Sequence, residues 1–559
     1  MKKLLNKSIK HIVILVVSLI LLNVVSQKVY KRFDLTTDQR YTLNPSALAI
    51  LDQADSPIII DVFLEGEDFP SEFRKLQLET RQLLEEFKAY NSNISFSFIN
   101  PIEDEATRDQ SIQQLNARGL TPMQLNVKEN GKTSQAVIFP WALASFNDTT
   151  VKIPLVKNTI GATQQQLVTN SVQQLEYAFA DGLSKLVNPK RRKIAVLKGN
   201  GQLENKYIAD YIKSIRDYYF IAPFTLDSVA NHATSTLKKL NEYDLVISAK
   251  PTEAFTEKEK FVLDQYTMNG GKSLWLLEQV AMDKDSLYND LGKNVAIPMD
   301  LNLTDFFFKY GVRINPLIVS SMYSAPITLA SGEGSNSQFQ SYPWTYSPLA
   351  KGNSRHPIVH NLDFLKFDFA NPMDTIKSST KKTILLQSAP LSKIEGTPRE
   401  ISLDMVSNQL DPKTFNKGPQ TLAVLLEGTF TSAYKNRVKP VTLDAVKDTS
   451  NPTKMIVISD GDVIKNDVGR NGVEELGFDK YTGQTFGNKE FLVNAANYLL
   501  DDTGLINIRS KEIAVAFLNP EKIAIQKTKW QLINILLPLV LLAVFGFIFN
   551  YLRKKKYAK

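Results

Sequence analysis

The C-terminal end of the chain contains the feature that most restricts its fold. Residues Trp530 to Leu552 read WQLINILLPLVLLAVFGFIFNYL and contain no charged side chain. Roughly 20 apolar residues, each rising about 1.5 Å along a helix, cross a bilayer core of about 30 Å. Trp530 and Tyr551 stand where interfacial aromatic side chains are common. The segment therefore predicts a transmembrane helix from Trp530 to Leu552, in preference to a buried helix of a soluble domain.

A second apolar run lies near the N-terminus. Residues Ile12 to Val25 read IVILVVSLILLNVV and follow four lysines. The run is short for a membrane span and has about the length of the apolar region of a signal peptide. No A-x-A-like cleavage site follows it. We therefore favour an uncleaved signal anchor from Ile12 to Val25, with a cleaved signal peptide as the alternative.

The charges that flank the two apolar runs predict the orientation. Five basic residues crowd positions 553–559, and the positive-inside rule places them in the cytoplasm. The N-terminal lysines indicate the same side, and two spans return both ends of the chain to it. We therefore expect a protein of the inner (cytoplasmic) membrane, with both termini cytoplasmic and the bulk of the chain periplasmic.

The basic character of the chain comes from its ends. The net charge is +8, but residues 1–10 and 553–559 together carry nine basic side chains and no acidic one. Removing these nine charges leaves −1 for the remaining residues. A region this close to neutral offers no polycationic surface, so we expect the lipid bilayer and no nucleic acid among the partners.

The content of cysteine and histidine excludes several kinds of chemistry. The chain has no cysteine, so disulfides, thiolate catalysis and cysteine-based metal sites are excluded. Among its four histidines, His356 and His360 have a spacing typical of metal ligands, but Pro357 interrupts the helix that would present both on one face. No G-x-S-x-G or H-E-x-x-H motif occurs. We expect no metal, no cofactor and no enzymatic activity.

Strands and helices alternate in the first part of the region between the two apolar runs. The pattern is strand, helix, strand, helix, hairpin, helix, which resembles a thioredoxin fold. Asn130-Gly131 is a strong hairpin signal, and a helix is expected over residues 163–187. By analogy with thioredoxins, we expect a cis peptide bond before Pro122. Because cysteine is absent, a thioredoxin-like unit would act as a scaffold.

Lys190-Arg191-Arg192 marks a boundary, after which the strand and helix pattern resumes. Strands expected over residues 193–197, 243–248 and 272–277 alternate with helices, which indicates a parallel, doubly wound sheet. The pattern returns at residues 455–459 (MIVIS), with a helix over 489–500. The sequence therefore predicts an α/β protein with these parts: residues 1–27, cytoplasmic N-terminus and signal anchor; 28–189, thioredoxin-like domain; 190–300 and 451–527, the two parts of a doubly wound domain; 301–450, a β-rich insertion; 528–559, transmembrane helix and basic tail.

Residues 270–273 (GGKS) resemble the end of a P-loop. The position of the first P-loop glycine is Tyr266, however, and a helix precedes the segment while a strand follows it. A P-loop needs the order strand, loop, helix, so that phosphates meet the N-terminus of the helix. We interpret the segment as a turn, and any ATPase must then be another subunit.

Two loops that follow predicted strands are candidate ligand sites. In the first, backbone amides at the start of a helix favour anions, although glycines there also serve tight turns. In the second, carboxylates at the end of a strand can bind cations or act as bases, although they are also common in turns. The candidate residues are Gly199, Asn200, Gly201 and Gln202 in the first loop, and Asp460 and Asp462 in the second.

Several segments together resemble a known family. They are the two anchors, DLTTDQRYTL (Asp34 to Leu43), KIAVLKGNGQ (Lys193 to Gln202), MIVISDGD (Met455 to Asp462) and NAANYL (Asn494 to Leu499). In this combination the chain resembles the GldG family, the gliding-motility-associated accessory subunits of ABC transporters in Bacteroidetes. Many members of the wider family have GHGE-like residues at the glycine loop, and the departure here weakens an inherited polar role for that loop.

The resemblance implies an integral-membrane ABC permease and a cytoplasmic ABC ATPase as partners, with no identified solute. The second domain also resembles the sheet of glutamine amidotransferases, but their nucleophilic cysteine is missing. We therefore expect a non-enzymatic, extracytoplasmic subunit that acts by binding or coupling. One alternative is a carbohydrate-binding or carbohydrate-active module, in which Tyr323, Tyr342, Trp344 and Tyr346 form a sugar-stacking surface. Another alternative is a purely structural tether.

Overall fold

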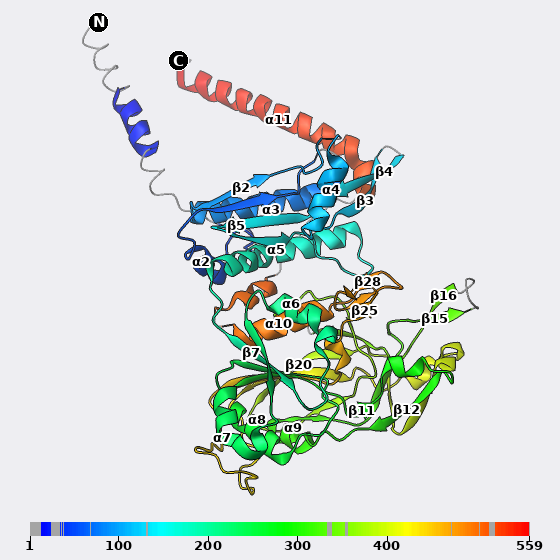
Figure 1. Ribbon diagram of the computed structural model, residues 1–559. Helices are drawn as coiled ribbons and strands as arrows, with labels where there is room; N and C mark the ends of the chain where they lie inside the picture. Colours follow the sequence, from blue (N-terminus) through cyan, green and yellow to red (C-terminus); the bar gives the residue numbers. More distant parts are fainter. Residues whose placement is uncertain are drawn as a thin grey trace.

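A computed structural model describes residues 13–23 and 34–557, apart from residues 35, 37–38, 67–68, 105, 130–131, 332–337, 353–355, 471, 502, 512 and 514–519. A smaller domain is stacked on a larger one, and a long helix leaves the smaller domain on the side away from the larger (Figure 1). Both domains mix helices and strands, which confirms the predicted α/β class.

The small domain is built on a four-stranded sheet with the order β2-β1-β5-β6. β2 is parallel to β1, whereas β5 is antiparallel to β1 and β6 to β5. Its elements are α2 (Pro45–Leu51), β1 (Ile58–Val62), α3 (Ser71–Tyr90), β2 (Ile94–Phe98), α4 (Arg108–Ala117), β3 (Met123–Glu129), β4 (Lys132–Ile138), β5 (Trp141–Phe146), β6 (Thr149–Pro154) and α5 (Gln164–Val187).

The alternation of side chains along β1 explains how the helices cover this sheet. Ile58, Ile60 and Val62 are fully buried, whereas Ile59 between them is 53% exposed. Because successive side chains of a strand point to opposite faces, the buried three lie on one face. That face packs against the apolar stripe of α3 and against α5.

One detail predicted for this domain is confirmed and one is wrong. The hairpin predicted around residues 130–131 is present as β3–β4, and it forms a two-stranded sheet of its own. The hairpin that completes the four-stranded sheet is β5–β6, whose turn contains Asn147 with a positive φ. The cis peptide bond expected before Pro122 is absent: within the described residues, the cis bond joins Thr397 and Pro398.

The chain returns to the small domain after completing the large one. A short 3₁₀ helix, η7 (Leu505–Ser510), packs against α5 and α2. Ile508 and Ile513, which are 1% and 8% exposed, enter the same apolar core as α3 and β1. The small domain is therefore assembled from residues before and after the large domain.

The large domain contains an 11-stranded sheet whose main path is β18-β17-β20-β23-β24-β10-β9-β7-β8. From β8 to β24 neighbouring strands are parallel, and from β24 to β18 they are antiparallel. The strands are β7 (Lys193–Lys198), β8 (Phe220–Thr225), β9 (Leu245–Ala249), β10 (Lys272–Leu276), β13 (Val312–Ile314), β17 (Leu349–Gly352), β18 (Leu365–Lys366), β19 (Met373–Thr375), β20 (Lys381–Ser388), β23 (Thr421–Gly428) and β24 (Thr453–Ile458).

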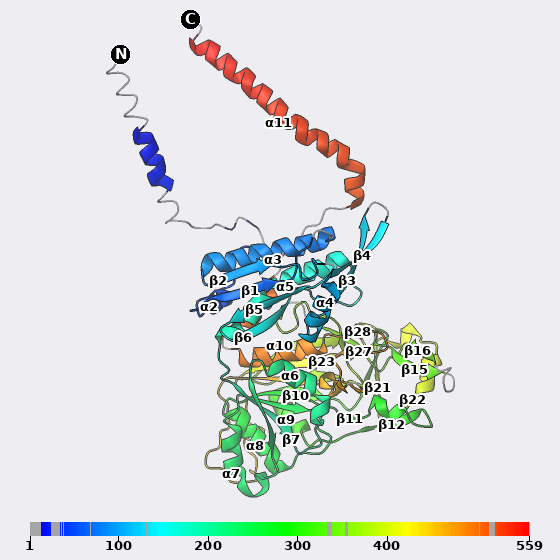
Figure 2. The same cartoon turned by 45° about the horizontal axis from the view of Figure 1, so that its top comes forward.

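Helices cover both faces of this sheet (Figure 2). On one face α6 and α10 pack over the core that contains Ile194 and Ile247. On the other, α7, α8 and α9 pack around Trp275. β9 is buried along its whole length, as expected of a parallel strand covered on both faces. The helices are α6 (Ala209–Ile215), α7 (Val229–Leu240), α8 (Glu257–Met268), α9 (Thr304–Tyr310) and α10 (Asn488–Leu500).

Six strands from residues 301–450 join this sheet: β13, β17, β18, β19, β20 and β23. Much of the stretch interpreted as an insertion thus extends the sheet, and the domain boundaries stay a prediction. Small sheets lie beside it: β11 (Val280–Ala281), β12 (Lys293–Pro298) and β22 (Arg399–Ser402) form one, and the others pair β14 (Ile318–Ser321) with β21 (Ser392–Glu395), β15 (Ile327–Ser331) with β16 (Gln338–Tyr342), β25 (Val468–Gly469) with β26 (Gly472–Val473) and β27 (Phe478–Asp479) with β28 (Gln484–Thr485).

The C-terminal helix α11 (Pro520–Tyr557) contains the predicted span from Trp530 to Leu552. Its segment Ile525–Tyr557 is long and apolar enough to cross a membrane and packs against nothing in the described chain. The N-terminal helix Val13–Asn23 is apolar but shorter than a span. The predicted limits of the first span, Ile12 and Val25, lie outside the described residues. The helix α11 thus indicates that the protein is membrane-associated, and the second span stays a prediction.

Candidate functional site

The carboxyl ends of β7, β9, β10 and β24 lie along one edge of the large sheet, because these strands are parallel. In sheets of this kind, ligands bind at this edge, above all where the strand order reverses. Here the order reverses at β7, since β8 lies on one side of it and β9 on the other. The residues that follow these strands are therefore the first place to look for a site.

The loop after β7 contains the candidates Gly199, Asn200, Gly201 and Gln202. The carbonyl oxygen of Asn200 accepts from the amides of Thr252 and Glu253, both at 3.1 Å, in the segment after β9. Within the loop, the Asn200 amide donates to Oε1 of Gln202 at 2.8 Å. The backbone amide of Asn200, which would face an anion at the start of this loop, thus already donates a hydrogen bond to a side chain of the protein.

Close packing also explains a glycine in this loop. Gly201 has φ +67, and a Cβ placed on it would lie 2.1 Å from Oγ1 of Thr252. The next element is a 3₁₀ turn, η1 (Asn205–Tyr207), and α6 begins only at Ala209. The loop therefore has no helix N-terminus directly behind it, and its geometry favours a tight turn. A ligand role for Gly199–Gln202 stays a prediction.

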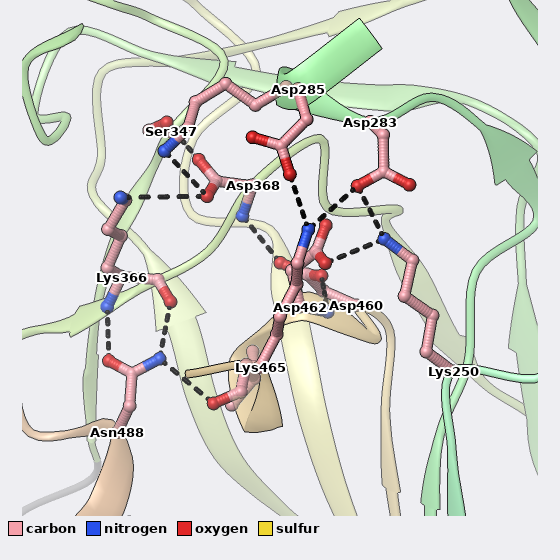
Figure 3. Close-up of polar contacts among 12 residues, drawn as sticks. Lys250, Asp283, Asp285, Ser347, Lys366, Asp368, Asp460, Asp462, Lys465 and Asn488 are labelled. Atoms are coloured by element: carbon pink, nitrogen blue, oxygen red, sulfur yellow. Dashed lines mark hydrogen bonds and ion pairs between the residues drawn. The ribbon is translucent and has the colours of Figure 1, made fainter. Parts of the chain in front are cut away.

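A buried lysine lies at the centre of the same sheet edge. Lys250 follows β9 directly, and its side chain is 4% exposed. Its Nζ lies 3.1 Å from Oδ1 of Asp283 and 2.7 Å from Oδ1 of Asp462 (Figure 3). The same Nζ lies 3.1 Å from Oε1 of Glu278. Glu278 comes after β10, and Asp462 comes after β24. One ammonium group thus joins the ends of three neighbouring parallel strands.

The pKa values of this cluster reflect burial and close charges. Desolvation lowers the pKa of Lys250, but the carboxylates of Asp462, Glu278 and Asp283 outweigh it and raise that pKa well above its ordinary value. Desolvation raises the pKa of Glu278 to about 8; the Lys250 ammonium opposes this shift, and the charge of Asp462 adds to it. For Asp460, which is fully buried, desolvation and then Asp462 raise the pKa well above its usual range. The lysine therefore stays charged, while some of the acids bind protons readily.

A second group of charges lies next to the first. Asp368 is flanked by Nζ of Lys284 at 3.6 Å and of Lys366 at 3.7 Å, and it accepts a hydrogen bond from the Ser347 hydroxyl. Desolvation raises the pKa of Asp368, but the two lysines outweigh it and lower that pKa below its usual value. The cavity here measures about 70 Å³, which is room for a few water molecules and not for a substrate.

The acidic groups allow a limited range of chemistry. Oxygens of Glu278, Asp460 and Asp462 lie within 4.8 Å of one another, which is close enough to hold a metal ion. Two of these residues already contact the Lys250 ammonium, so the chain supplies a cation of its own. Asp460 uses its oxygens to accept from the amides of Asp368 and Asp462. The cluster ties the ends of three strands together, and a ligand role for Asp460 and Asp462 stays a prediction.

The structure thus places the predicted loops along one edge without joining them in one site. Asp460 and Asp462 belong to the lysine cluster, whereas the glycine loop packs against the neighbouring residues Thr252 and Glu253. Sequence analysis missed Lys250 and Glu278. Both directly follow buried strands, which is the signal that could have identified them.

The predicted sugar-stacking surface is wrong for two of its four aromatic residues. Trp344 and Tyr346 are 2% and 3% exposed and pack with Phe369 in a satellite core. Tyr323, in contrast, is 59% exposed, and Tyr342 is half-buried against the same core. His356 packs its ring on Tyr498 at 4.9 Å between centroids. The four tyrosine and tryptophan rings therefore do not form one exposed platform.

These features describe a membrane-associated α/β protein in which the best-formed polar cluster joins the ends of neighbouring strands. A family model described as an ABC-type uncharacterized transport system matches residues 191–495, which is more than half of the chain. The chain belongs to this family of ABC transport auxiliary proteins, and the match supports a non-catalytic accessory role in transport beside a membrane ABC transporter. A second model, of a domain of unknown function, matches residues 37–145.

Individual relatives add little to this assignment. An uncharacterised protein of Borreliella burgdorferi is 21% identical over 398 residues, which are 70% of this chain and 71% of the relative. Among solved structures, the N-terminal domain of mmIFT52 is 15% identical, with a TM-score of 0.31 over 55% of this chain and 97% of that one. A ThuA-like protein from Parabacteroides merdae is 10% identical, with a TM-score of 0.26 over 56% and 90%. Both structural likenesses are too weak to carry an argument.

Proposed function

We propose that the protein is a non-enzymatic, extracytoplasmic subunit of an ABC transport complex, anchored in the inner membrane by a span at each end. Its partners are an integral permease and a cytoplasmic ABC ATPase, and its work is binding or coupling. The observation that carries the proposal is α11: an apolar segment of 33 residues projects from the folded domains and is unburied. In a family of ABC transport auxiliary proteins, a membrane helix that packs against no other described part of the chain fits contact with a permease.

The two domains fit the role of a scaffold. The order β2-β1-β5-β6, with one parallel and two antiparallel pairs, supports a thioredoxin-like assignment for the small domain. The parallel strands β8 to β24 support a sheet like that of the glutamine amidotransferases. Neither type of enzyme can work without cysteine, and the chain has none. The resemblance to gliding-associated subunits supports a role in gliding motility.

A structural tether is the second candidate. The observation that favours it is the loop after β7, where Thr252 and Glu253 fill the place at which ligands usually bind. A tether and a binding subunit both need the permease, but only the binding subunit needs a ligand. The two therefore differ in whether the soluble domains bind a small molecule.

The test is purification of the tagged, full-length protein from its own cells in a mild detergent. We expect a permease and an ABC ATPase to co-purify in fixed proportion, and deletion of the gene to impair gliding. The matched control is a tagged chain that ends at residue 519 and so lacks α11; it should lose both partners. Recovery of the full chain alone, together with intact transporter assembly and gliding in the deletion strain, would refute the proposal.

A further inference from the structure

A cleft lies between the two domains and is lined by α5 and α10. Figure 1 shows these two helices on the facing sides of the small and the large domain. Its volume is about 440 Å³, within the range of small-molecule sites in proteins. The small domain contributes α5 and residues 152–158, and the large domain contributes α10 and residues 485–487. Because both domains line it, any molecule held there contacts both.

Two buried cations share one carboxylate at the floor of this cleft. Nζ of Lys157 lies 3.3 Å from Oε1 of Glu490, and Nη2 of Arg509 lies 2.6 Å from the same oxygen. The side chains of Lys157 and Arg509 are 9% and 2% exposed. The Nε of Arg509 has no hydrogen-bond partner among the described residues. Glu490 by itself therefore balances only one of these two cations.

Asp363 adds a second carboxylate to the lining, which accepts from the amides of Ile160 and Phe364 and attracts Lys157. With its amide oxygen turned towards the cations, Gln174 accepts from Lys157 and Arg509, both at 3.1 Å, and it carries no charge. Desolvation, followed by repulsion from Arg509, lowers the pKa of Lys157 to about 8 despite Glu490 and Asp363. Burial of the ammonium group thus outweighs the attraction of both carboxylates.

Most of the charges on the walls are paired with each other. Lys185 lies 3.0 Å from Asp181, and Lys489 lies 3.0 Å from Glu475. Tyr218 donates its hydroxyl hydrogen to Asp181 and stands under the Lys185 ammonium, 4.4 Å from it. Over the whole lining, the basic side chains outnumber the acidic ones by one, so the cleft carries an excess of one positive charge. The bases are Lys152, Lys157, Lys185, Lys489 and Arg509, and the acids are Asp181, Asp363, Glu475 and Glu490.

We propose that this cleft binds a small anionic molecule, whose carboxylate or phosphate lies against Lys157 and Arg509 and whose polar body lies between the walls. A guanidinium and an ammonium group side by side recognise such an oxyanion strongly when they are shielded from water. The volume suits a body about the size of a sugar. The inference rests on the proposed function, because it names the class of ligand for the binding role.

Occupancy would also change how the domains are held together. Lys157 belongs to the small domain, Glu490 belongs to the large domain, and Arg509 lies in the segment that returns between them. An anion bound at this junction contacts residues of both domains, so its binding stabilises the arrangement of the domains that the structure shows.

The test is isothermal titration calorimetry of the full-length, detergent-solubilised protein with glucose 6-phosphate and with glucuronate, against neutral glucose. Inorganic phosphate in a fourth titration separates a free oxyanion from one carried on a sugar body. We expect saturable binding of at least one of the anionic sugars, and none of glucose. Binding should weaken as the pH rises from 7 to 9, because Lys157 loses its proton in this range.

Variants of Lys157 make the test specific to the cleft. Lys157→Gln should lower the affinity at least tenfold, and Lys157→Arg should restore most of it. Lys293→Gln, which removes an exposed partner of Glu400 elsewhere in the large domain, is the matched control and should bind as the natural chain does. Circular dichroism confirms that each variant is folded.

The inference is overturned if the folded natural chain binds neither anionic sugar, or if Lys157→Gln binds as tightly as the natural chain. Its failure is separable from failure of the proposed function. A chain that binds no anion but co-purifies with a permease and an ATPase contradicts only the cleft. A chain that binds an anion but has no such partners contradicts only the transport assignment.

Discussion

Lys250 lies where the loops after β9, β10 and β24 meet. Its ammonium group supplies the positive charge that a bound cation would otherwise provide there. Its side chain is almost completely buried, and three carboxylates surround its ammonium group. Removing one partner from a buried ionic group leaves the remaining charges uncompensated, which costs more than the group contributes when complete. The lysine should therefore matter for stability even though it touches no ligand.

We expect Lys250→Met to destabilise the large domain by about 3–5 kcal/mol at pH 7, the usual cost of breaking a buried ion pair. The loss should depend on pH. Without the ammonium group, the pKa values of Glu278 and Asp462 rise further above those of the unfolded chain. Acids with raised pKa values stabilise the fold below the unfolded value, and this contribution is lost as the pH rises through the folded value. The deficit of the variant should be smaller at pH 5 than at pH 8.

Thermal unfolding followed by tryptophan fluorescence measures this, since Trp275 is buried in the large domain. The control is Lys293→Met, which breaks an ion pair whose two side chains are 42% and 57% exposed and should change the stability by less than about 1 kcal/mol. Equal melting of the Lys250 variant and the natural chain at pH 8 would show that the cluster does not stabilise the fold.

The residues of this cluster show what a strand pattern can and cannot predict. Asp460 and Asp462 were found because they end a clear β-branched run. Lys250 was not, because a lysine after a strand is usually a solvated turn residue. Its burial depends on Glu278 and Asp283, which are brought to it only by the parallel pairing of β9 with β10. Such a partnership is a property of the fold and not of any local pattern.

The loop between β7 and η1 is an element whose glycines have a structural use. Gly201 has φ +67, and an added Cβ would meet Oγ1 of Thr252 at 2.1 Å and the amide of Glu253 at 3.3 Å. Gly483, in the turn between β27 and β28, has the same φ but open space around it. At both positions an added side chain would strain the backbone. Only at Gly201 would it also come too close to neighbouring atoms.

Gly483→Ala should therefore destabilise the protein by only the left-handed backbone cost of about 1 kcal/mol, and Gly201→Ala by about 2–4 kcal/mol. The shift in melting temperature of each variant measures the difference. A shift of the same size for both would mean that the chain after β9 moves away easily. The loop would then be open enough to hold a ligand.

Elements with strong local signals were predicted well. Helix α8 (Glu257–Met268) lies between the strands expected over residues 243–248 and 272–277, where the alternating pattern predicts a helix. Thr256 and Glu259 form a capping box at its start, and Gly270 follows its end. Strands β17, β18 and β19 have two to four residues each and carry no periodicity. They belong to the sheet only through antiparallel pairing with β20 and β23. Residues 301–450 were therefore interpreted as an insertion.

At the scale of the whole molecule, the sequence could not predict that the residues after the large domain return to the small domain. Ile508 and Ile513 come after the large domain, yet they pack in the core of the small one. A contact across more than 300 residues leaves no local pattern, whereas the apolar composition of α11 is a local property and was found at once. The same return brings Arg509 to Lys157, which lies before the large domain.

The orientation in the membrane is a testable property of the whole chain, and the absence of cysteine makes the natural protein a ready background. Val438, in the large domain, is 92% exposed, and Lys556 lies at the end of α11. In spheroplasts, a membrane-impermeant maleimide should label a Val438→Cys chain. A Lys556→Cys chain should be labelled only after the membrane is opened with detergent, because basic residues after a span remain on the cytoplasmic side. The natural chain, which cannot react, is the control. Labelling of the Lys556→Cys chain alone in sealed spheroplasts would reverse the orientation and place both domains on the ATPase side of the membrane.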